Sequence, residues 1–204
     1  MACRALLPLV AAGCLAGLVA AVTVAVGHWI PPPIPVRGGE SFAEPILLPV
    51  PDFRQDDPAW AADTIGGSDE AVKAVGCALS SAAMVATYLG VPCTPRELNH
   101  RLKRIDGYTA RGWLRWQAVA DASDGRLRLT YAGGPDHQRL DACLRAGVPA
   151  IVRVPLGSLG PGVGVVGKRG RDYMVNDPLG QHPSPVPLAS VADRIQAMRI
   201  FHAW

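Results

Sequence analysis

The sequence has few charged residues and no paired cysteine motif, and each shortage excludes a class of protein. Charged residues make up 18% of the 204-residue chain and hydrophobic residues 49%, a balance that disfavours a disordered chain or a coiled coil. The net charge of +3 is too small for a nucleic-acid groove. None of the five cysteines belongs to a C-x-x-C pair, which removes the common structural zinc sites and thioredoxin-like redox chemistry. We therefore expect a compact domain with no metal, no cofactor and no nucleic-acid partner.

The N-terminal thirty residues are apolar and indicate export. No residue from Ala5 to Val26 is charged, and Arg4 precedes this run. A run of this length spans a bilayer core of roughly 30 Å, and a basic residue before it is typical of a secretion signal. Because the run exceeds the roughly 7–15 apolar residues of a cleaved signal, an uncleaved single-pass anchor is favoured over a signal peptide. Lipoprotein processing at Cys14 is disfavoured by the apolar residues after it. We expect residues 1–30 to hold the domain outside the cell membrane, or to direct its secretion.

A segment rich in proline and glycine follows the apolar run. It contains three consecutive prolines at 31–33 and ends in Gly38 and Gly39. Such a composition predicts an extended polyproline spacer with a glycine hinge. We therefore expect a linker over 31–45 and a folded domain over 46–204.

Within the domain, the helical patterns come first and most of the strand patterns later. Residues 77–89 are small or apolar on every side, which predicts a buried helix. Thr94 and Pro95 form an N-cap and first helical position for a second helix that ends near Lys103. Further helices are expected over 113–122 and 138–146, an edge strand over 46–51, and strands over 150–154, 163–166 and 172–176. This order indicates an α+β domain with its helices and strands segregated.

Three cysteines, Cys77, Cys93 and Cys143, lie outside the apolar N-terminal run. An odd number in an exported protein indicates a reactive thiol or an intermolecular bond. Cys77 stands at the start of the buried helix, where the helix dipole and unpaired N–H groups stabilise a thiolate. A small buried residue would fit that position equally well. We predict a disulfide between Cys93 and Cys143 and an unpaired Cys77.

An ordered series of short motifs surrounds Cys77. The series consists of Phe53-Arg54-Gln55, the Trp60 loop, residues 76–85, residues 88–90, residues 94–99, residues 146–150 and residues 173–178. It resembles the papain-like cysteine peptidases of the bacteriocin-leader-processing type, the C39-like peptidase domains of exported bacterial proteins, over residues 46 to 180. The resemblance implies a papain-like fold, with a helical N-terminal lobe that holds the nucleophile helix and a C-terminal antiparallel β lobe. It also implies hydrolysis of peptide or amide bonds.

Carried over residue by residue, the resemblance gives three positions a catalytic role. Cys77 would be the nucleophile, Gln55 the side-chain donor of the oxyanion hole, and Asp177 the acid that orients the catalytic imidazole. Together they would attack an amide carbonyl and hold the developing oxyanion. From the residues alone, Gln55 is also compatible with a solvated loop, and Asp177 with a simple turn former in Asn-Asp-Pro.

The sequence departs from the family at the histidine. The expected position falls on Pro161 or Gly162, and neither side chain can carry a proton. His182 is the only histidine near the expected site and the only candidate substitute base. The other four fit poorly by position; they are His28, His100, His137 and His202. Two functions stay open: an exported cysteine peptidase that is impaired or inactive, and a non-catalytic cell-surface module that binds a peptide or protein.

Overall fold

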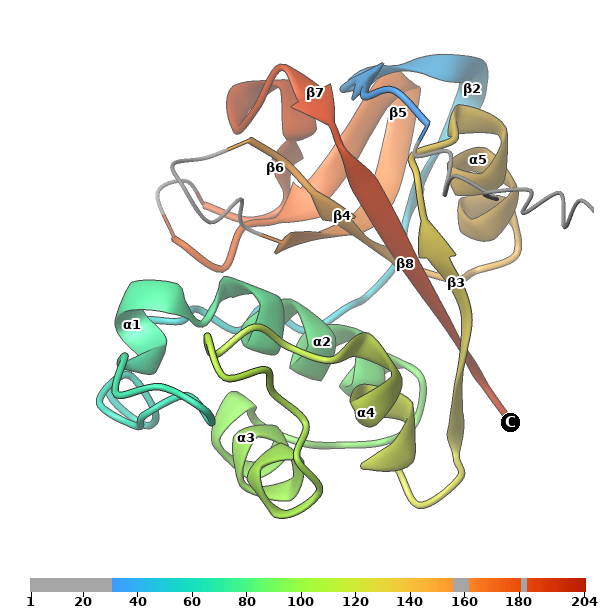
Figure 1. Cartoon of the computed structure of the whole chain (residues 1–204). Coiled ribbons are helices and arrows are strands. Elements are labelled where there is room, and N and C mark those ends of the chain that lie inside the picture. Colours follow the sequence, from blue (N-terminus) through green and yellow to red (C-terminus); the bar gives the residue numbers. More distant parts are fainter. Residues whose placement is uncertain (1–30, 156–161, 181–182) are drawn as a thin grey trace, which may run out of the picture.

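The computed structural model describes residues 31–155, 162–180 and 183–204. A six-stranded antiparallel sheet occupies one half of the molecule, and most of the helices lie together below it (Figure 1). Along the sheet the strand order is β2-β5-β4-β8-β3, with β6 also paired to β5. The strands are β2 (Arg37–Leu47), β3 (Leu127–Gly133), β4 (Ala150–Arg153), β5 (Gly162–Asn176), β6 (Val186–Pro187) and β8 (Ala197–Ala203). A separate pair joins β1 (Ile34–Pro35) to β7 (Arg194–Ile195).

The helices are α1 (Val72–Val75), α2 (Cys77–Tyr88), α3 (Pro95–Arg104), α4 (Trp116–Asp121) and α5 (His137–Arg145), with a 3-10 turn at Leu188–Ser190. Helix α3 begins as predicted, because Thr94 and Glu97 form a reciprocal capping box that satisfies two unpaired backbone donors. Asp136 caps α5 through the backbone N–H groups of Gln138 and Arg139. Helix α4 begins three residues later than its apolar pattern predicts, at Trp116.

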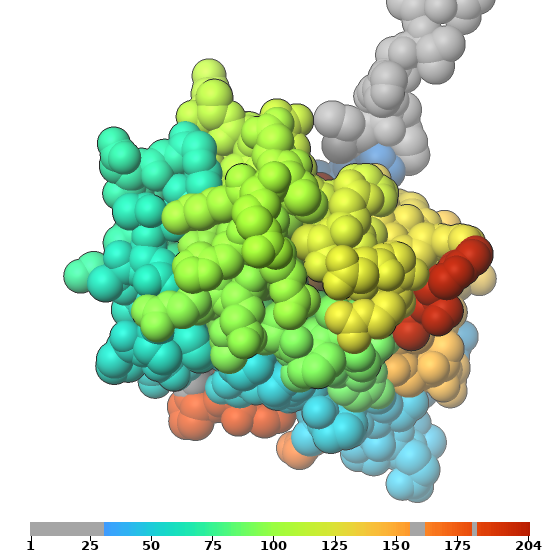
Figure 2. Space-filling model, turned by 90° about the horizontal axis from the view of Figure 1, so that it is seen from below, coloured from blue at the N-terminus to red at the C-terminus, as the bar shows by residue number. Residues whose placement is uncertain are grey.

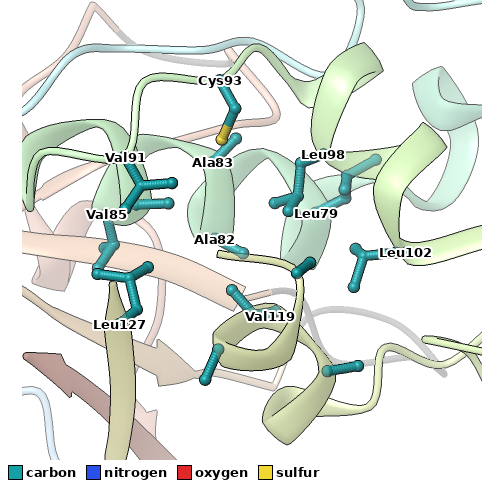
Figure 3. Packing of buried hydrophobic residues seen from close by; sticks show 14 of the residues in the cluster. Leu79, Ala82, Ala83, Val85, Val91, Cys93, Leu98, Leu102, Val119 and Leu127 are labelled. Carbon is teal, nitrogen blue, oxygen red and sulfur yellow. The ribbon is translucent and has the colours of Figure 1, made fainter. Parts of the chain in front are cut away.

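The sheet separates two hydrophobic cores. Side chains alternate along a strand, so in β4 Ile151 packs toward the helices while Ala150 and Val152 pack on the opposite face. The helical core joins α2 to its neighbours (Figure 3): Leu79 of α2, Leu98 of α3 and other labelled residues form one cluster. On the opposite face, α5 and the 3-10 turn at Leu188–Ser190 cover the second core. Burial of α2 on all sides explains why its sequence has no polar face.

The predicted spacer is not a spacer in the structure. Residues 37–47 form β2, which pairs with β5 from Arg37↔Asp172 to Leu47↔Gly167 and buries Phe42. Register shifts on either side of Phe42 let a strand with two glycines and a proline stay paired, as β-bulges do at sheet edges. The folded unit therefore begins well before residue 46, and the linker expected over 31–45 is wrong for residues 34–45.

Two further expectations are corrected by the structure. The strands expected over 163–166 and 172–176 are parts of one strand, β5, because Gly167–Arg171 continues the pairing with β2. The disulfide expected between Cys93 and Cys143 is absent, and both thiols are free. Cys93 lies in the core on the helical side and Cys143 in the core across the sheet, so the sheet separates them.

Seen from below, the helical side fills the view, and the C-terminal end of β8 emerges at one edge beside the segment after α4 (Figure 2). A hydrogen bond from the Trp204 N–H to the Arg126 carbonyl, at 2.9 Å, holds this end. Within the described ranges, no helix has the length and apolarity needed to cross a bilayer. The anchor or signal predicted over residues 1–30 lies outside those ranges.

Candidate active site

A cavity of about 470 Å³ lies between the start of α2 and the sheet. Most of its lining is apolar or aromatic. It comes from the loop before α1, from the ends of α1, α2 and α4, from the loop around Trp113 and from β4. These lining residues are Ile65, Val75, Leu79, Tyr108, Trp113, Leu114, Trp116 and Ile151. Cys77 also lines it. Concave apolar sites with a few polar groups are the usual form of ligand pockets, and this one contains the predicted nucleophile.

Cys77 is the first residue of α2 and is half-buried at the cavity wall. Gly76 precedes it as N-cap and provides no side-chain cap. Burial raises the pKa of the Cys77 thiol, the charge of Asp177 adds to the increase, and backbone hydrogen bonds at Gly162 and Ala78 oppose it only in part. The thiolate expected at this helix start is therefore not favoured, because desolvation outweighs the backbone donors that would stabilise it.

Gly162, one of the two candidate histidine positions, lies against the start of α2. A Cβ atom placed there would be 3.4 Å from Cγ2 of Ile151 and 3.6 Å from Cα of Ala78, which is ordinary contact. The Ser81 hydroxyl donates a hydrogen bond of 2.9 Å to the Gly162 carbonyl and fixes this end of β5 on α2. The position thus has room for the first atom of a side chain. Pro161, the other candidate, lies outside the described residues.

Gln55 is buried, with 3% of its surface exposed, so the solvated-loop interpretation is wrong. Its Nε2 donates to the Lys73 carbonyl at 2.7 Å, and its Oε1 has no partner among the described residues. Its backbone N–H donates to the Pro178 carbonyl at 2.8 Å. Gln55 is therefore fixed beside α1 and the 177–178 turn, but it is not part of the cavity lining.

Asp177 is also buried. Its Oδ1 accepts the Leu179 N–H at 3.0 Å, and its own N–H donates to the Ser184 hydroxyl at 3.0 Å. These bonds are those of a turn-forming aspartate. Asp177 nevertheless stays near enough to Cys77 for its charge to raise the pKa of the thiol. The structure therefore brings Gln55, Cys77 and Asp177 to one region of the fold.

No histidine lines the cavity within the described part of the chain. His100 is exposed on α3. His137 Nδ1 lies 3.1 Å from the Tyr173 hydroxyl, and His202 Nδ1 lies 2.8 Å from the Thr130 hydroxyl. His28 and His182 lie outside the described residues. Across those same residues, no group of three His, Cys, Asp or Glu side chains could hold a metal ion.

A solved structure shares this architecture. It is the crystal structure of a protein from Bacillus anthracis titled a "putative C39-like peptidase", with 16% sequence identity and a TM-score of 0.50. The match covers 77% of this chain and 97% of the other. The fold is C39-like. No protein-family model matches the chain, and no curated protein matches it by sequence.

The C39-like fold here carries basic residues that sequence reasoning missed. Arg153 of β4, Arg199 of β8 and Arg111 of the Trp113 loop line the cavity, together with one acid, Glu70. Among the described residues, none of the three arginines takes part in an ion pair, whereas seven other basic residues do. Only the strand register could have indicated that Arg153 and Arg199 meet, and β8 was not predicted from the sequence.

Proposed function

We propose that this chain is a papain-type, C39-like peptidase domain that holds a peptide in the Cys77 cavity, and that its hydrolysis is impaired. The observation that carries the proposal is the placement of Cys77 at the first position of α2, on the wall of a cavity, against Gly162. In this arrangement the nucleophile and its cleft are retained, while the residue beside the thiol has no side chain to act as a base.

The chemistry explains the expected impairment. A thiolate must attack the amide carbonyl, and an imidazole must protonate the leaving amine. With the pKa of Cys77 raised, the thiol stays protonated near neutral pH. Loss of one general acid–base group typically costs about 10²–10⁴-fold in rate. Asp177 would orient an imidazole if one were present, and Gln55 would contribute a donor to the oxyanion if its amide turned away from Lys73.

The experiment restores the missing base. Gly162→His and, separately, Pro161→His are assayed against a peptide library beside the parent protein and Cys77→Ala. Because a Cβ fits at Gly162 without collision, we expect Gly162→His to raise peptide turnover, by roughly 10²-fold or more. The gain should disappear when Cys77→Ala is added.

A parent that cleaves peptides briskly, and loses that activity in Cys77→Ala, would contradict the impairment. His182→Asn would then test the substitute base. Gly162→Ala serves as the matched control for the added Cβ, since it adds bulk and no proton carrier.

The second candidate function is peptide or protein binding with no hydrolysis at all. One observation favours it: the Gln55 amide, the expected oxyanion donor, already donates to the Lys73 carbonyl. On this alternative the cavity binds a peptide without cleaving it. Gly162→His then gives no turnover, although the variant still binds peptides.

The proposal includes a location outside the cytoplasmic membrane, on the cell surface or secreted. Its support is the uncharged run 5–26 after Arg4. Protease added to intact spheroplasts that express the full chain should digest the domain, or the domain should be in the medium. Protection of the domain until the cells are lysed would exclude this topology.

A further inference from the structure

Two arginines lie on the cavity face of the sheet, next to the position that faces Cys77. Arg153 of β4 pairs directly with Gly162 of β5, and Arg199 of β8 pairs with Ile151. Residues directly opposite in an antiparallel pair share a face of the sheet, as do residues two apart on one strand. Arg153, Ile151 and Arg199 therefore share the face that looks toward α2, and all three line the cavity.

The chain provides no acid to neutralise them. All seventeen aspartates and glutamates belong to the described residues, so no undescribed segment can supply a carboxylate side chain. None of these acids lies within ion-pair distance of Arg153 or Arg199. Glu70 lines the same cavity without pairing with either. The two like charges therefore face one cavity in which the single acid, Glu70, forms no ion pair with either of them.

Arg199 is also incompletely hydrogen-bonded. Its Nη1 donates to the Met198 carbonyl at 2.8 Å and to the Gly133 carbonyl at 3.4 Å, and its guanidinium lies 5.5 Å from the Trp116 ring centre. Its Nε is buried and has no partner among the described residues. A buried donor without an acceptor is costly, and a charged one more so. Because Nε has no accessible surface, an anion in the cavity would reach the guanidinium through its terminal nitrogens and would offset the like charge of Arg153.

We infer that the Arg153–Arg199 end of the cavity binds a carboxylate of the peptide that lies over Cys77, and that the apolar wall binds an adjacent apolar side chain. The planar guanidinium fork matches a carboxylate, and a carboxylate between two guanidinium groups gains charge-assisted hydrogen bonds. Because Arg153 is directly opposite Gly162, this carboxylate lies close to the bond that would reach the thiol. Trp113, Trp116 and Ile151 line the apolar part.

This inference rests on the proposed function, and the test separates the two by measuring binding alone. All proteins carry Cys77→Ala, so no peptide is consumed. Three capped probes are titrated by calorimetry: leucyl-phenylalanyl-glutamate amide, leucyl-phenylalanyl-glutamine amide, and leucyl-phenylalanine with a free C-terminal carboxylate. The first probe carries its carboxylate on the glutamate side chain, and the third carries it at the C-terminus. The second probe, with glutamine, is the neutral match of the first.

We expect at least one carboxylate probe to bind roughly tenfold or more tightly than the glutamine probe, and added salt to reduce the preference. Arg153→Met and Arg199→Met should each remove most of the preference while keeping the aliphatic contact. Arg171→Met, which removes an exposed arginine of β5 outside the cavity, should keep it. The carboxylate probe that binds with the higher affinity shows whether the site prefers a side-chain or a C-terminal carboxylate.

Equal affinity for all three probes would overturn the inference and leave the peptide-binding proposal intact. No measurable binding of any probe would contradict the proposed function itself. Should Arg199→Met fail to fold, the exposed Arg153 decides the question: a carboxylate preference that survives Arg153→Met overturns the inference.

Discussion

The sheet holds basic side chains in two contrasting environments. On one side, Lys168 of β5 is fully buried, pairs with Asp141 of α5, and donates to the Gly38 carbonyl at 2.9 Å. The Tyr173 hydroxyl donates to the same Asp141 carboxylate at 2.8 Å. We call these groups the Lys168 cluster. On the other side, Arg153 and Arg199 line a cavity and pair with no acid.

The two environments differ in whether the fold itself satisfies the buried charge. Removing a charge from water is expensive, and the cost is offset only when partners satisfy it. In the Lys168 cluster, β2, α5 and β5 each provide a partner: the Gly38 carbonyl, Asp141 and Tyr173. Nothing is left there for a ligand to satisfy. Arg199 burial instead lowers the pKa of its guanidinium, and the charge of Arg153 adds to that decrease. A deficit of this kind is what an anionic ligand would remove.

The largest expected effect comes from breaking the Lys168 cluster. Asp141→Ala leaves the Lys168 ammonium buried without its counter-charge, and removal of one partner of a buried pair costs about 3–5 kcal/mol. We expect the free energy of unfolding to fall by that amount, as measured by urea denaturation of the full chain. A loss below about 1 kcal/mol would mean that the cluster is not structural.

Arg199→Met is the matched control on the other side of the sheet. It removes a charge that has no counter-charge, so we expect the free energy of unfolding to change by less than about 1 kcal/mol or to increase. If Arg199→Met destabilised the protein as much as Asp141→Ala, the contrast between the two environments would be wrong.

A smaller effect concerns the thiol in the cavity. Because burial raises the pKa of Cys77, the protonated form should dominate through neutral pH, and the reactive thiolate should form only above the usual thiol pKa of about 8.5. Alkylation by iodoacetamide should therefore be slow at pH 7 and rise about tenfold per pH unit until the pH reaches the raised pKa of the thiol. Mass spectrometry of the Cys77 peptide gives the rate.

Cys93 and Cys143 provide the internal reference, because both are buried. They should react more slowly than Cys77 at every pH at which the protein is folded. Fast alkylation of Cys77 at pH 7 would indicate a thiolate stabilised by a nearby cation, and Arg153 and Arg199, which line the same cavity, would be examined together with His182.

Helix signals in the sequence predicted the structure better than strand signals did. Thr94, Asp136 and Gly147 act within a few residues, so the bounds of α3 and α5 follow from local chemistry. Strand β2 could not be recognised, because its pairing with β5 is a contact between residues more than a hundred positions apart. Its two glycines and its proline, after the prolines at 31–33 and 35, have the local signature of a spacer.

The candidate site shows the same division. The position of Cys77 at a helix start follows from the local sequence, and the structure confirms that position. That the Gln55 amide is held by the Lys73 carbonyl depends on a tertiary contact between a loop and α1, and that Arg199 lies opposite Ile151 depends on the register of two distant strands. Periodicity within one segment does not reveal which residue of another segment stands opposite.

Strand β2 also decides how the domain would respond to a mechanical load. Any force applied through the chain at residue 31 reaches the fold by way of β1 and β2. Strand β2 begins with the exposed Arg37–Asp172 ion pair, and the next residue, Gly38, holds Lys168 through its carbonyl. Gly39 has a positive φ of 65°, and a Cβ there would collide with Asp141 Oδ2, so the strand passes tightly over the cluster. A pull on the N-terminal side would therefore load the Arg37–Asp172 ion pair and the Lys168 cluster before it reached the cavity.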